Sequence, residues 1–268
     1  MKYDLNNKTV VITGASSGIG KEMAERLIKN YNCRVYAIAR REEILEEIKT
    51  NLGENFIPIP FDVSIEENWI SFSENLQKLN VCVDVLINCA GILPKFESVE
   101  KTNSSSVKKV METNFFSQIY ATYALLPLIK KSKDGAIISV ASASALCPFA
   151  GISSYCASKA SSERFFECFS SENKEIYVAT IMPGFVKTNI MKNQHASEKD
   201  VKAFLIFCAD LNKTVSKIFK QIRRKKKRII IGKDAHLINF MFKLFPNSAP
   251  KIITFVLKKS GLGIFSEI

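Results

Sequence analysis

A tyrosine and a lysine four residues apart, Tyr155 and Lys159 in the stretch SSYCASKASSERFF, could work as an acid–base pair. Four residues is close to one helical turn, so both side chains can enter the same cleft. A free tyrosine has a pKa near ~10 and a free lysine near ~10.4, so neither is an obvious catalyst at neutral pH. A nearby positive charge stabilises the phenolate, but bringing its pKa towards neutrality takes on the order of 4 kcal/mol and therefore a cleft shielded from water. Taken singly, such a pair is more often a packed ring beside a solvated amine, so the rest of the chain must decide.

A glycine-rich turn, TGASSGIG (13–20), follows the first apolar run and opens a helical stretch. Gly14, Gly18 and Gly20 permit a tight turn and the close approach of a ligand to the backbone. The helix start offers free N–H groups and a positive dipole end to a pyrophosphate. A tight strand-to-helix connection would use the same glycines, but the position after the first strand favours a dinucleotide site.

The end of the second apolar run reads YAIARREE and carries Arg40 and Arg41, with no carboxylate at the strand end. An NAD site usually has an acidic residue here for the ribose 2′-hydroxyl, whereas guanidinium groups suit a 2′-phosphate. We therefore expect NADP in preference to NAD. The alternative is that both arginines pair with the acidic residues of 42–47.

Strand-like and helix-like stretches alternate along the chain, which predicts crossover units and a parallel sheet covered on both faces. We expect one doubly wound α/β domain of Rossmann type over 1–268, with about seven strands. Two regions are read as additions within it, an insertion at 189–211 and an apolar, basic extension at 233–268. The expected strands are 8–13, 33–39, 56–63, 81–91, 135–142, 175–184 and 228–232, and the expected helices begin near 19, 42, 106 and 155.

The composition is that of a globular protein, with 47% hydrophobic and 24% charged residues in 268. The first eight residues, MKYDLNNK, lack the apolar core of a signal peptide, and no run reaches the ~18 apolar residues of a membrane-spanning helix. Seven scattered cysteines and two histidines argue against a metal site or a disulfide framework. These features favour reduced thiols and a cytoplasmic location.

The ordered set of short stretches resembles the short-chain dehydrogenase/reductase family over about residues 8–189. It comprises TGASSGIG, FDV (61–63), NCAG (88–91), METNFF, SVASASA, YCASK and PGFVKT (183–188). The resemblance implies that Tyr155 is the general acid or base, that Lys159 tunes it, that Ser142 holds the substrate oxygen, and that Asn114 carries a proton relay. For cofactor binding it implies roles for Gly14, Ser16, Ser17, Gly18, Ile19, Gly20, Arg40, Arg41, Asp62, Val63, Asn88, Ala90, Gly91, Tyr155, Lys159, Val186 and Thr188. The chain departs from the usual NNAG at Cys89, which we expect to pack behind the strand without loss of activity.

The loops expected on the substrate side are apolar. They read ILPKFES (92–98), SALCPFAGIS (144–153) and 189–211, and they carry few fixed charges. A hydrophobic ketone or alcohol, such as a hydroxysteroid, bile acid or acyl chain, suits such a rim, although several of its residues could simply fill the core. The expected lining is Leu93, Leu146, Phe149, Met191 and Phe204, with Phe96 and Phe207 on the same rim.

The net charge of +12 belongs to the C-terminal part, because residues 211–268 hold 14 Lys/Arg against two acids. The run Arg223 to Arg228 lacks the companions of a nucleic-acid site, so no nucleic-acid partner is expected. It could be a solvated helix end, while HLINFMFKLF and IITFVLKK resemble an interfacial amphipathic segment at a membrane surface. The same apolar stretches could instead cover the substrate mouth or form a dimer contact. We expect a homodimer or homotetramer.

Taken together, the sequence predicts an oxidoreductase that transfers a hydride between NADP(H) and an apolar ketone or secondary alcohol. Two alternatives remain open at this stage. One is a 3-oxoacyl or lipid ketone reductase at a membrane surface, and the other is a non-enzymatic protein that senses NADP.

Overall fold

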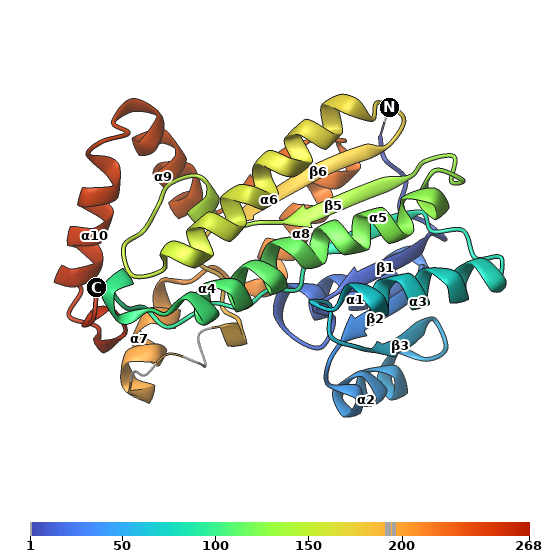
Figure 1. Ribbon diagram of the computed structural model, residues 1–268, viewed down its shortest axis with the longest axis horizontal. Coiled ribbons are helices and arrows are strands. Elements are labelled where there is room, and N and C mark those ends of the chain that lie inside the picture. Colours follow the sequence, from blue (N-terminus) through green and yellow to red (C-terminus); the bar gives the residue numbers. More distant parts are fainter. Residues whose placement is uncertain (1, 191–193, 195–196) are drawn as a thin grey trace.

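A parallel sheet organises the computed structural model, which describes residues 2–190, 194 and 197–268 (Figure 1). Within these residues seven strands lie in the order β3-β2-β1-β4-β5-β6-β7. The chain thus leaves β1 in one direction for β2 and β3 and returns beside β1 with β4, which confirms the predicted doubly wound fold. The strands are β1 (Thr9–Thr13), β2 (Arg34–Ala39), β3 (Phe56–Pro60), β4 (Val85–Asn88), β5 (Ala136–Val140), β6 (Tyr177–Pro183) and β7 (Arg228–Ile231).

Helices cover both faces of the sheet (Figure 1). One face is covered by α1, α2 and α8, and the other by α3, α5 and α6. Alternate residues of each strand serve the two layers, so that Val10 and Ile12 of β1 belong to one buried cluster and Val11 to the other. The helices are α1 (Gly18–Tyr31), α2 (Glu42–Leu52), α3 (Glu66–Lys78), α4 (Ser104–Met111), α5 (Ser117–Ile129), α6 (Ser153–Glu172), α7 (Glu198–Phe207), α8 (Leu211–Arg223), α9 (Lys233–Leu244) and α10 (Ala249–Lys259).

Several elements differ from the sequence expectation in extent. The expected strand 56–63 ends at Pro60 and lies at the edge of the sheet, where prolines are tolerated. The long helix expected over 106–131 is two helices, α4 and α5, joined by a π-helical turn at Glu112–Phe116. Helix α3 was not expected at all, and it buries the ring of Trp69.

A third apolar cluster lies beyond the carboxyl ends of the strands, where α7, α9 and α10 stand in Figure 1. It includes Phe96, Phe149 and Phe204 from the substrate-side loops and Phe265 from a short 3₁₀ turn, Gly263–Phe265. No helix among the described residues combines the length and apolar character needed to cross a membrane.

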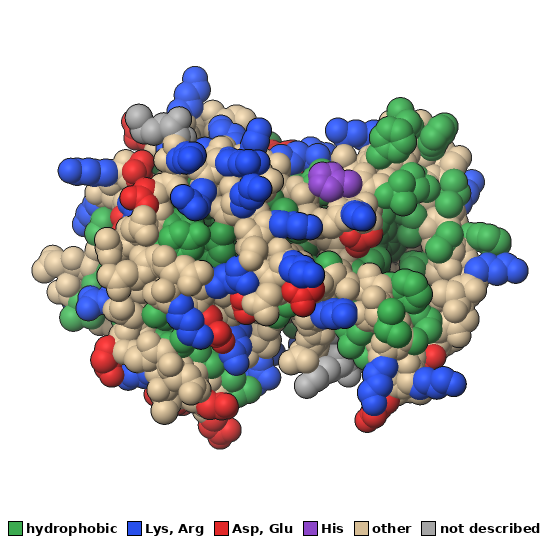
Figure 2. Space-filling model, turned by 180° about the vertical axis from the view of Figure 1, so that it is seen from behind, with side chains coloured by type: hydrophobic (Ala, Val, Ile, Leu, Met, Phe, Trp, Pro, Cys, Tyr) green, Lys and Arg blue, Asp and Glu red, His purple; other side chains and the backbone are tan. Residues whose placement is uncertain are grey.

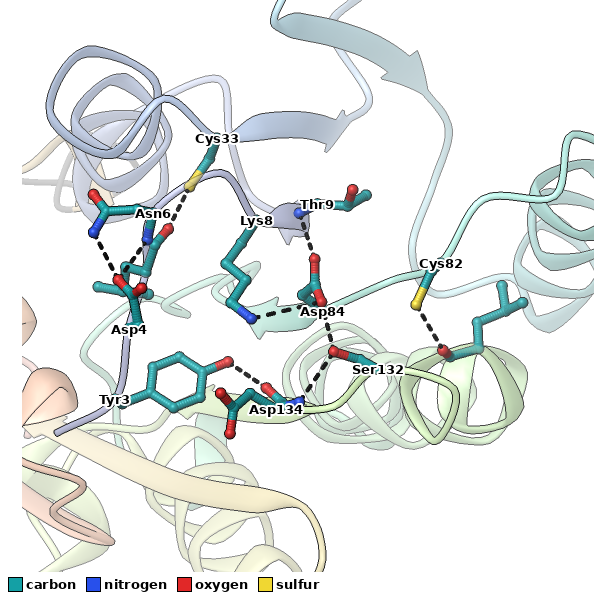
Figure 3. Close-up of polar contacts among 12 residues, drawn as sticks. Tyr3, Asp4, Asn6, Lys8, Thr9, Cys33, Cys82, Asp84, Ser132 and Asp134 are labelled. Atoms are coloured by element: carbon teal, nitrogen blue, oxygen red, sulfur yellow. Dashed lines mark hydrogen bonds and ion pairs between the residues drawn. The ribbon is translucent and has the colours of Figure 1, made fainter. Parts of the chain in front are cut away.

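Polar contacts tie the strands together at the opposite, amino end of the sheet (Figure 3). Asp84, just before β4, accepts hydrogen bonds from the Thr9 backbone N–H (2.9 Å) and the Ser132 hydroxyl, and its carboxylate lies 3.8 Å from Lys8. The Tyr3 hydroxyl donates to the Asp134 carbonyl at 2.8 Å. These bonds join the starts of β1, β4 and β5, so the register of the central strands is fixed far from the cleft.

Candidate active site

A cleft of about 400 Å³ opens at the carboxyl ends of the central strands. This is where ligands bind in open sheets whose strand order reverses, and here the reversal falls between β1 and β4. The lining includes the glycine turn, three of the four predicted catalytic residues and part of the predicted apolar rim. From the predicted set these are Gly14, Ser17, Gly18, Ile19, Gly20, Arg41, Gly91, Leu93, Phe96, Ser142, Phe149, Tyr155, Lys159, Val186, Thr188 and Phe204.

The three glycines of the turn stand where a side chain would collide with its surroundings or strain the backbone. Gly14 and Gly18 have positive φ angles of 71° and 56°, and a Cβ on Gly14 would stand 3.0 Å from the Ala90 backbone. A Cβ on Gly20 would lie 2.4 Å from the Gly14 carbonyl oxygen. The neighbouring strand end is locked to this turn, because the Thr13 hydroxyl accepts from the N–H groups of Cys89 and Ala90, both at 2.9 Å.

Tyr155 and Lys159 both lie in the first two turns of α6 and are almost fully buried. The Lys159 ammonium donates to the Val140 carbonyl at 3.0 Å and lies 5.8 Å from the centroid of the Tyr155 ring. Burial lowers the pKa of Lys159 to about 8, so the group is still mainly protonated at pH 7. In the protein alone, burial raises the pKa of Tyr155 to about 12, and a hydrogen bond with Ser142 moderates the rise.

Ser142 comes directly after β5 and begins a 3₁₀ turn, where its hydroxyl accepts from the Ser144 N–H at 3.2 Å. The side chain thus faces Tyr155 across the cleft from a fixed backbone position. Ser144 also lines the cleft, and its buried hydroxyl has no hydrogen-bond partner among the described residues.

Asn114 sits in the π-helical turn between α4 and α5 and is completely buried. Its carboxamide accepts from the Ile92 N–H at 2.7 Å, donates to the Ile92 carbonyl at 3.0 Å and donates to the Ser158 hydroxyl at 3.0 Å. A Cβ on Gly91 would lie 3.3 Å from both Asn114 Oδ1 and Lys159 Nζ, so Asn114 borders the lysine without lining the cleft. Single π-helical turns within helices often mark functional sites.

A buried polar network behind these residues was missed by the sequence reasoning. The Gln118 amide donates to the Asn114 carbonyl at 2.6 Å and to the Ser162 hydroxyl at 3.2 Å, and it accepts from the Ser139 hydroxyl at 2.7 Å. The network joins α5, β5 and α6 under the catalytic pair. Its helical members follow Asn114 and Ser158 by four residues, which is the signal that could have found them.

The two arginines after β2 differ in their contacts. Arg41 lines the cleft and donates to the Ser16 hydroxyl at 2.9 Å, whereas Arg40 is not part of the lining and lies 3.9 Å from the Asp62 carboxylate. The alternative of pairs with the acidic residues of 42–47 is not what the structure shows. Burial would raise the pKa of Asp62, but hydrogen bonds from Ser64 and the charge of Arg40 hold it below its usual range.

Four other predicted cofactor residues lie outside the cleft lining. Val63 is buried beside α3, and Ala90 is held through its backbone. Asn88 ends β4 fully buried, and its carboxamide has no hydrogen-bond partner among the described residues. Ser16 does not line the cleft itself, but its hydroxyl accepts a hydrogen bond from Arg41, which does.

The structure brings part of the predicted apolar rim into the cleft lining. Leu93, Phe96, Phe149 and Phe204 line the cleft, but Leu146 is packed within the third apolar cluster and is not part of the lining. Phe207 was wrongly placed, because its side chain is 82% exposed on α7. Met191 lies outside the described residues. Further residues of the three predicted loops also line this side, namely Ile92, Ile152, Asn189, Ile190 and Cys208. Residues outside these loops join them: Ala141, Pro183, Gly184 and Phe185.

The position of Cys89 differs in part from the sequence expectation. Cys89 packs against the core as expected, but it also lines the cleft, and burial raises the pKa of its thiol to about 12.

The half of the cleft next to β1 and β4 fits a nicotinamide dinucleotide. Backbone N–H groups at the start of α1, an approach cleared of side chains by three glycines, and a guanidinium at its edge are the groups that a dinucleotide requires. The segment after β6 faces the same turn, because a Cβ on Gly18 would lie 3.3 Å from the Thr188 methyl group. The residues proposed to hold the nicotinamide end therefore lie opposite those proposed to hold the phosphates.

Comparison with known proteins agrees with this geometry. The family model for short chain dehydrogenases matches residues 8–199. An "11-beta-hydroxysteroid dehydrogenase-like 2" protein of Arabidopsis thaliana is 31% identical over 263 residues, which cover 95% of this chain and 82% of the relative.

Two solved structures share the fold. A short chain dehydrogenase of Burkholderia cenocepacia in complex with NADP has a TM-score of 0.79 at 22% identity and covers 94% of this chain and 99% of its own. A short chain dehydrogenase/reductase of Burkholderia phymatum in complex with NAD has a TM-score of 0.78 at 18% identity, covering 90% and 96%. Fold, cleft and family match lead to one conclusion: the chain belongs to the short-chain dehydrogenase/reductase family of nicotinamide-dependent oxidoreductases.

Proposed function

We propose that this protein transfers a hydride between NADP(H) and an apolar ketone or secondary alcohol. The observation that carries the proposal is the cleft itself, in which Ser142, Tyr155 and Lys159 stand between a dinucleotide cradle and an apolar rim. The hydroxysteroid dehydrogenase-like name of the Arabidopsis relative supports a substrate of this class.

Tyr155 exchanges the proton and Ser142 holds the oxygen of the substrate in this scheme. With a pKa of about 12 in the protein alone, Tyr155 is protonated at neutral pH and ready to donate to a ketone. A bound nicotinamide ring would supply or accept the hydride and, when positively charged, would favour the phenolate. Lys159, anchored on the Val140 carbonyl, keeps a positive charge near the phenol. Asn114 positions this pair, because its carboxamide ties the strand end at Ile92 to Ser158 of α6.

The preference for NADP over NAD rests on Arg41. Its guanidinium already contacts Ser16 of the glycine turn, and the two groups together suit a 2′-phosphate by charge-assisted hydrogen bonds. The structure of a neighbour with NADP supports this proposal, although another neighbour was solved with NAD. Arg40 is assigned a lesser part because it pairs with Asp62.

The rim favours a hydrophobic substrate. Leu93, Phe96, Phe149, Ile152 and Phe204 face the catalytic groups. A sugar or an acid would leave its polar groups unpaired against these side chains, which costs binding free energy. We therefore place a steroid, a bile acid or an acyl ketone ahead of a hydrophilic substrate.

The test is turnover of a panel of steroids, bile acids and acyl ketones, followed by absorbance at 340 nm. Tyr155→Phe should lower kcat/KM about 10²- to 10⁴-fold, the usual contribution of a general acid or base, while NADPH still binds. Binding is measured separately by quenching of Trp69 fluorescence or by calorimetry. Turnover retained by the Phe variant would refute the proposed acid–base role.

The cofactor preference has its own test. Arg41→Ala should weaken NADPH binding roughly 10- to 100-fold, the loss expected for hydrogen bonds to a charged group, and leave NADH binding unchanged. Arg40→Ala is the matched control and should change the ratio little. An unchanged NADPH to NADH ratio in the Arg41 variant would reject this reading.

A cytoplasmic location and a homodimeric or homotetrameric state are also proposed. All seven cysteines are free, which supports a reducing compartment. Tyr123 on the outer side of α5 is 60% exposed, which supports a contact between copies through this helix. Light scattering on a gel-filtration column measures the oligomeric state, and a monomer at micromolar concentration would contradict the proposal.

A further inference from the structure

The outer sides of α9 and α10 carry large apolar side chains that face solvent. Leu237, Phe240 and Leu244 follow one another at helical spacing along α9, and Ile252, Phe255 and Val256 do so along α10. Together with Phe245 between the helices they form the C-terminal apolar patch, with exposed fractions from 46% to 61%. Figure 2 shows these green side chains gathered at the end of the molecule formed by α9 and α10.

The inner sides of the same helices are apolar as well. Ile238 and Met241 of α9 and Ile253 and Leu257 of α10 pack into the third apolar cluster. A surface helix of a globular protein normally turns a polar side outwards, so two neighbouring helices that are apolar on both sides indicate a second surface to be covered.

The charged residues of α9 and α10 after Asp234 are all of one sign. Between Asp234 and Glu267 the chain has four lysines (Lys243, Lys251, Lys258 and Lys259) and no acidic residue. The same face of the molecule carries a second basic group over α1 and α8, visible as blue side chains in Figure 2. Lys2, Arg26, Lys220, Arg223 and Arg224 line a hollow there. None of Lys220, Arg223 and Arg224 makes an ion pair with a described acidic side chain.

We propose that this face, the C-terminal apolar patch with its lysines and the basic group of α8, docks on an anionic phospholipid surface. Apolar side chains at the headgroup boundary and cations against acidic lipids are the two contributions that hold interfacial proteins in place. A two-fold contact between two copies through this patch would bring the lysines of one against those of the other. A nucleic acid would match the cations but would leave the aromatic and aliphatic side chains uncovered.

The position of the patch relates docking to the cleft. The third apolar cluster runs from the cleft-lining Phe96, Phe149 and Phe204 to the inner sides of α9 and α10. Docking therefore brings the apolar half of the cleft close to the lipid, where a hydrophobic substrate would be dissolved. The docking itself does not depend on the proposed substrate, since it is measured without turnover.

The experiment is sedimentation of the purified protein with sucrose-loaded vesicles of phosphatidylcholine alone or with 30% phosphatidylglycerol, in low and high salt. We expect binding to the anionic vesicles that weakens as salt rises, and at least tenfold weaker binding to phosphatidylcholine alone. The double variant Arg223→Glu/Arg224→Glu should bind anionic vesicles at least 30-fold more weakly, and Phe240→Ser/Phe255→Ser at least tenfold more weakly.

Two controls come from the opposite face of the molecule. Ile70→Ser removes a comparably exposed apolar side chain from α3, and Lys78→Glu reverses a charge at the end of the same helix. Both should bind like the wild type, and circular dichroism checks that all variants fold. Equal binding by wild type and both double variants, or no binding at all, would overturn the proposal. Loss of a dimer in the Phe240/Phe255 variant without any vesicle binding would show that a second copy covers the patch.

Discussion

Removing the buried charge of Lys159 should change how the stability of the protein depends on pH. Burial lowers the pKa of this lysine from 10.5 to about 8, so protonation of its amine is less favourable in the folded protein than in the unfolded chain. Between pH 8 and pH 10.5 the unfolded chain binds more protons, so stability rises with pH in this window. Below pH 8 the full free-energy cost of burying the charged lysine is present. The pKa difference between 10.5 and 8, at 1.36 kcal/mol per unit, makes this cost about 3 kcal/mol.

The variant Lys159→Met keeps most of the side-chain volume and removes the titration. Relative to this variant, the wild type should gain about 2.5 kcal/mol in free energy of unfolding between pH 7 and pH 10. Any cost of the substitution that does not vary with pH, such as a change in packing, cancels in the comparison. Urea unfolding, followed by the fluorescence of the single tryptophan, Trp69, measures both curves without added salt.

Lys78→Met, on the exposed end of α3, is the matched control, and its curve should run parallel to that of the wild type. A free-energy difference between wild type and Lys159→Met that stays constant from pH 7 to pH 10 would refute the reasoning. It would mean that the lysine is as well solvated in the folded protein as in the unfolded chain.

Three further outcomes follow from the site. Alcohol oxidation needs the phenolate of Tyr155, whose pKa lies near 12 in the protein alone. The value of kcat/KM for oxidation should therefore rise from pH 6 to pH 8, whereas kcat/KM for ketone reduction should not. Parallel pH profiles for the two directions would contradict this assignment. Gly20→Ala should abolish NADPH binding, because the added Cβ would lie 2.4 Å from a backbone oxygen. Gly53→Ala is the control: its φ of 79° is strained for alanine, but no atom lies within 4 Å of the added Cβ, so only stability should fall. Calorimetry of NADPH binding and of unfolding separates the two effects. Asn114→Ala leaves the backbone of Ile92 without partners and should lower the free energy of unfolding by about 2–4 kcal/mol in urea denaturation; a loss below 1 kcal/mol would show that these bonds contribute little.

The parts of the fold that follow from local patterns could be predicted from the sequence. The strands of the central sheet are continuous apolar runs because helices cover them on both faces, and the glycine turn after β1 has a backbone requirement that few residues meet. Helix α3 was missed because its apolar residues, Trp69, Phe72 and Leu76, stand among many polar ones. The π-helical turn could not be predicted, since it depends on the contacts of Asn114 with the next strand and with α6.

In the candidate site, too, features that depend on local sequence patterns could be predicted, whereas features that depend on tertiary contacts could not. Helical spacing predicted that Tyr155 and Lys159 share a cleft, and the family resemblance added Ser142. All three line one cleft in the structure. Burial raises the pKa of Tyr155 in the protein alone, and the extent of burial cannot be read from spacing. The separate roles of Arg40 and Arg41 depend on which of the two adjacent side chains turns towards Ser16, and a sequence carries no such information.

The polar contacts around Asp84 give the two ends of the sheet different freedom of motion. Hydrogen bonds from Thr9 and Ser132 hold β1, β4 and β5 together at their amino ends, while at the carboxyl ends the Thr13 hydroxyl joins β1 to the residues after β4 and the loops border the cleft. Backbone amides should therefore exchange with deuterium most slowly near Asp84 and faster towards the glycine turn. Slowest exchange near Asp84 would show that the strands are held at the end away from the cleft, so that the loops over the cleft can rearrange for a cofactor or a substrate without loosening the sheet.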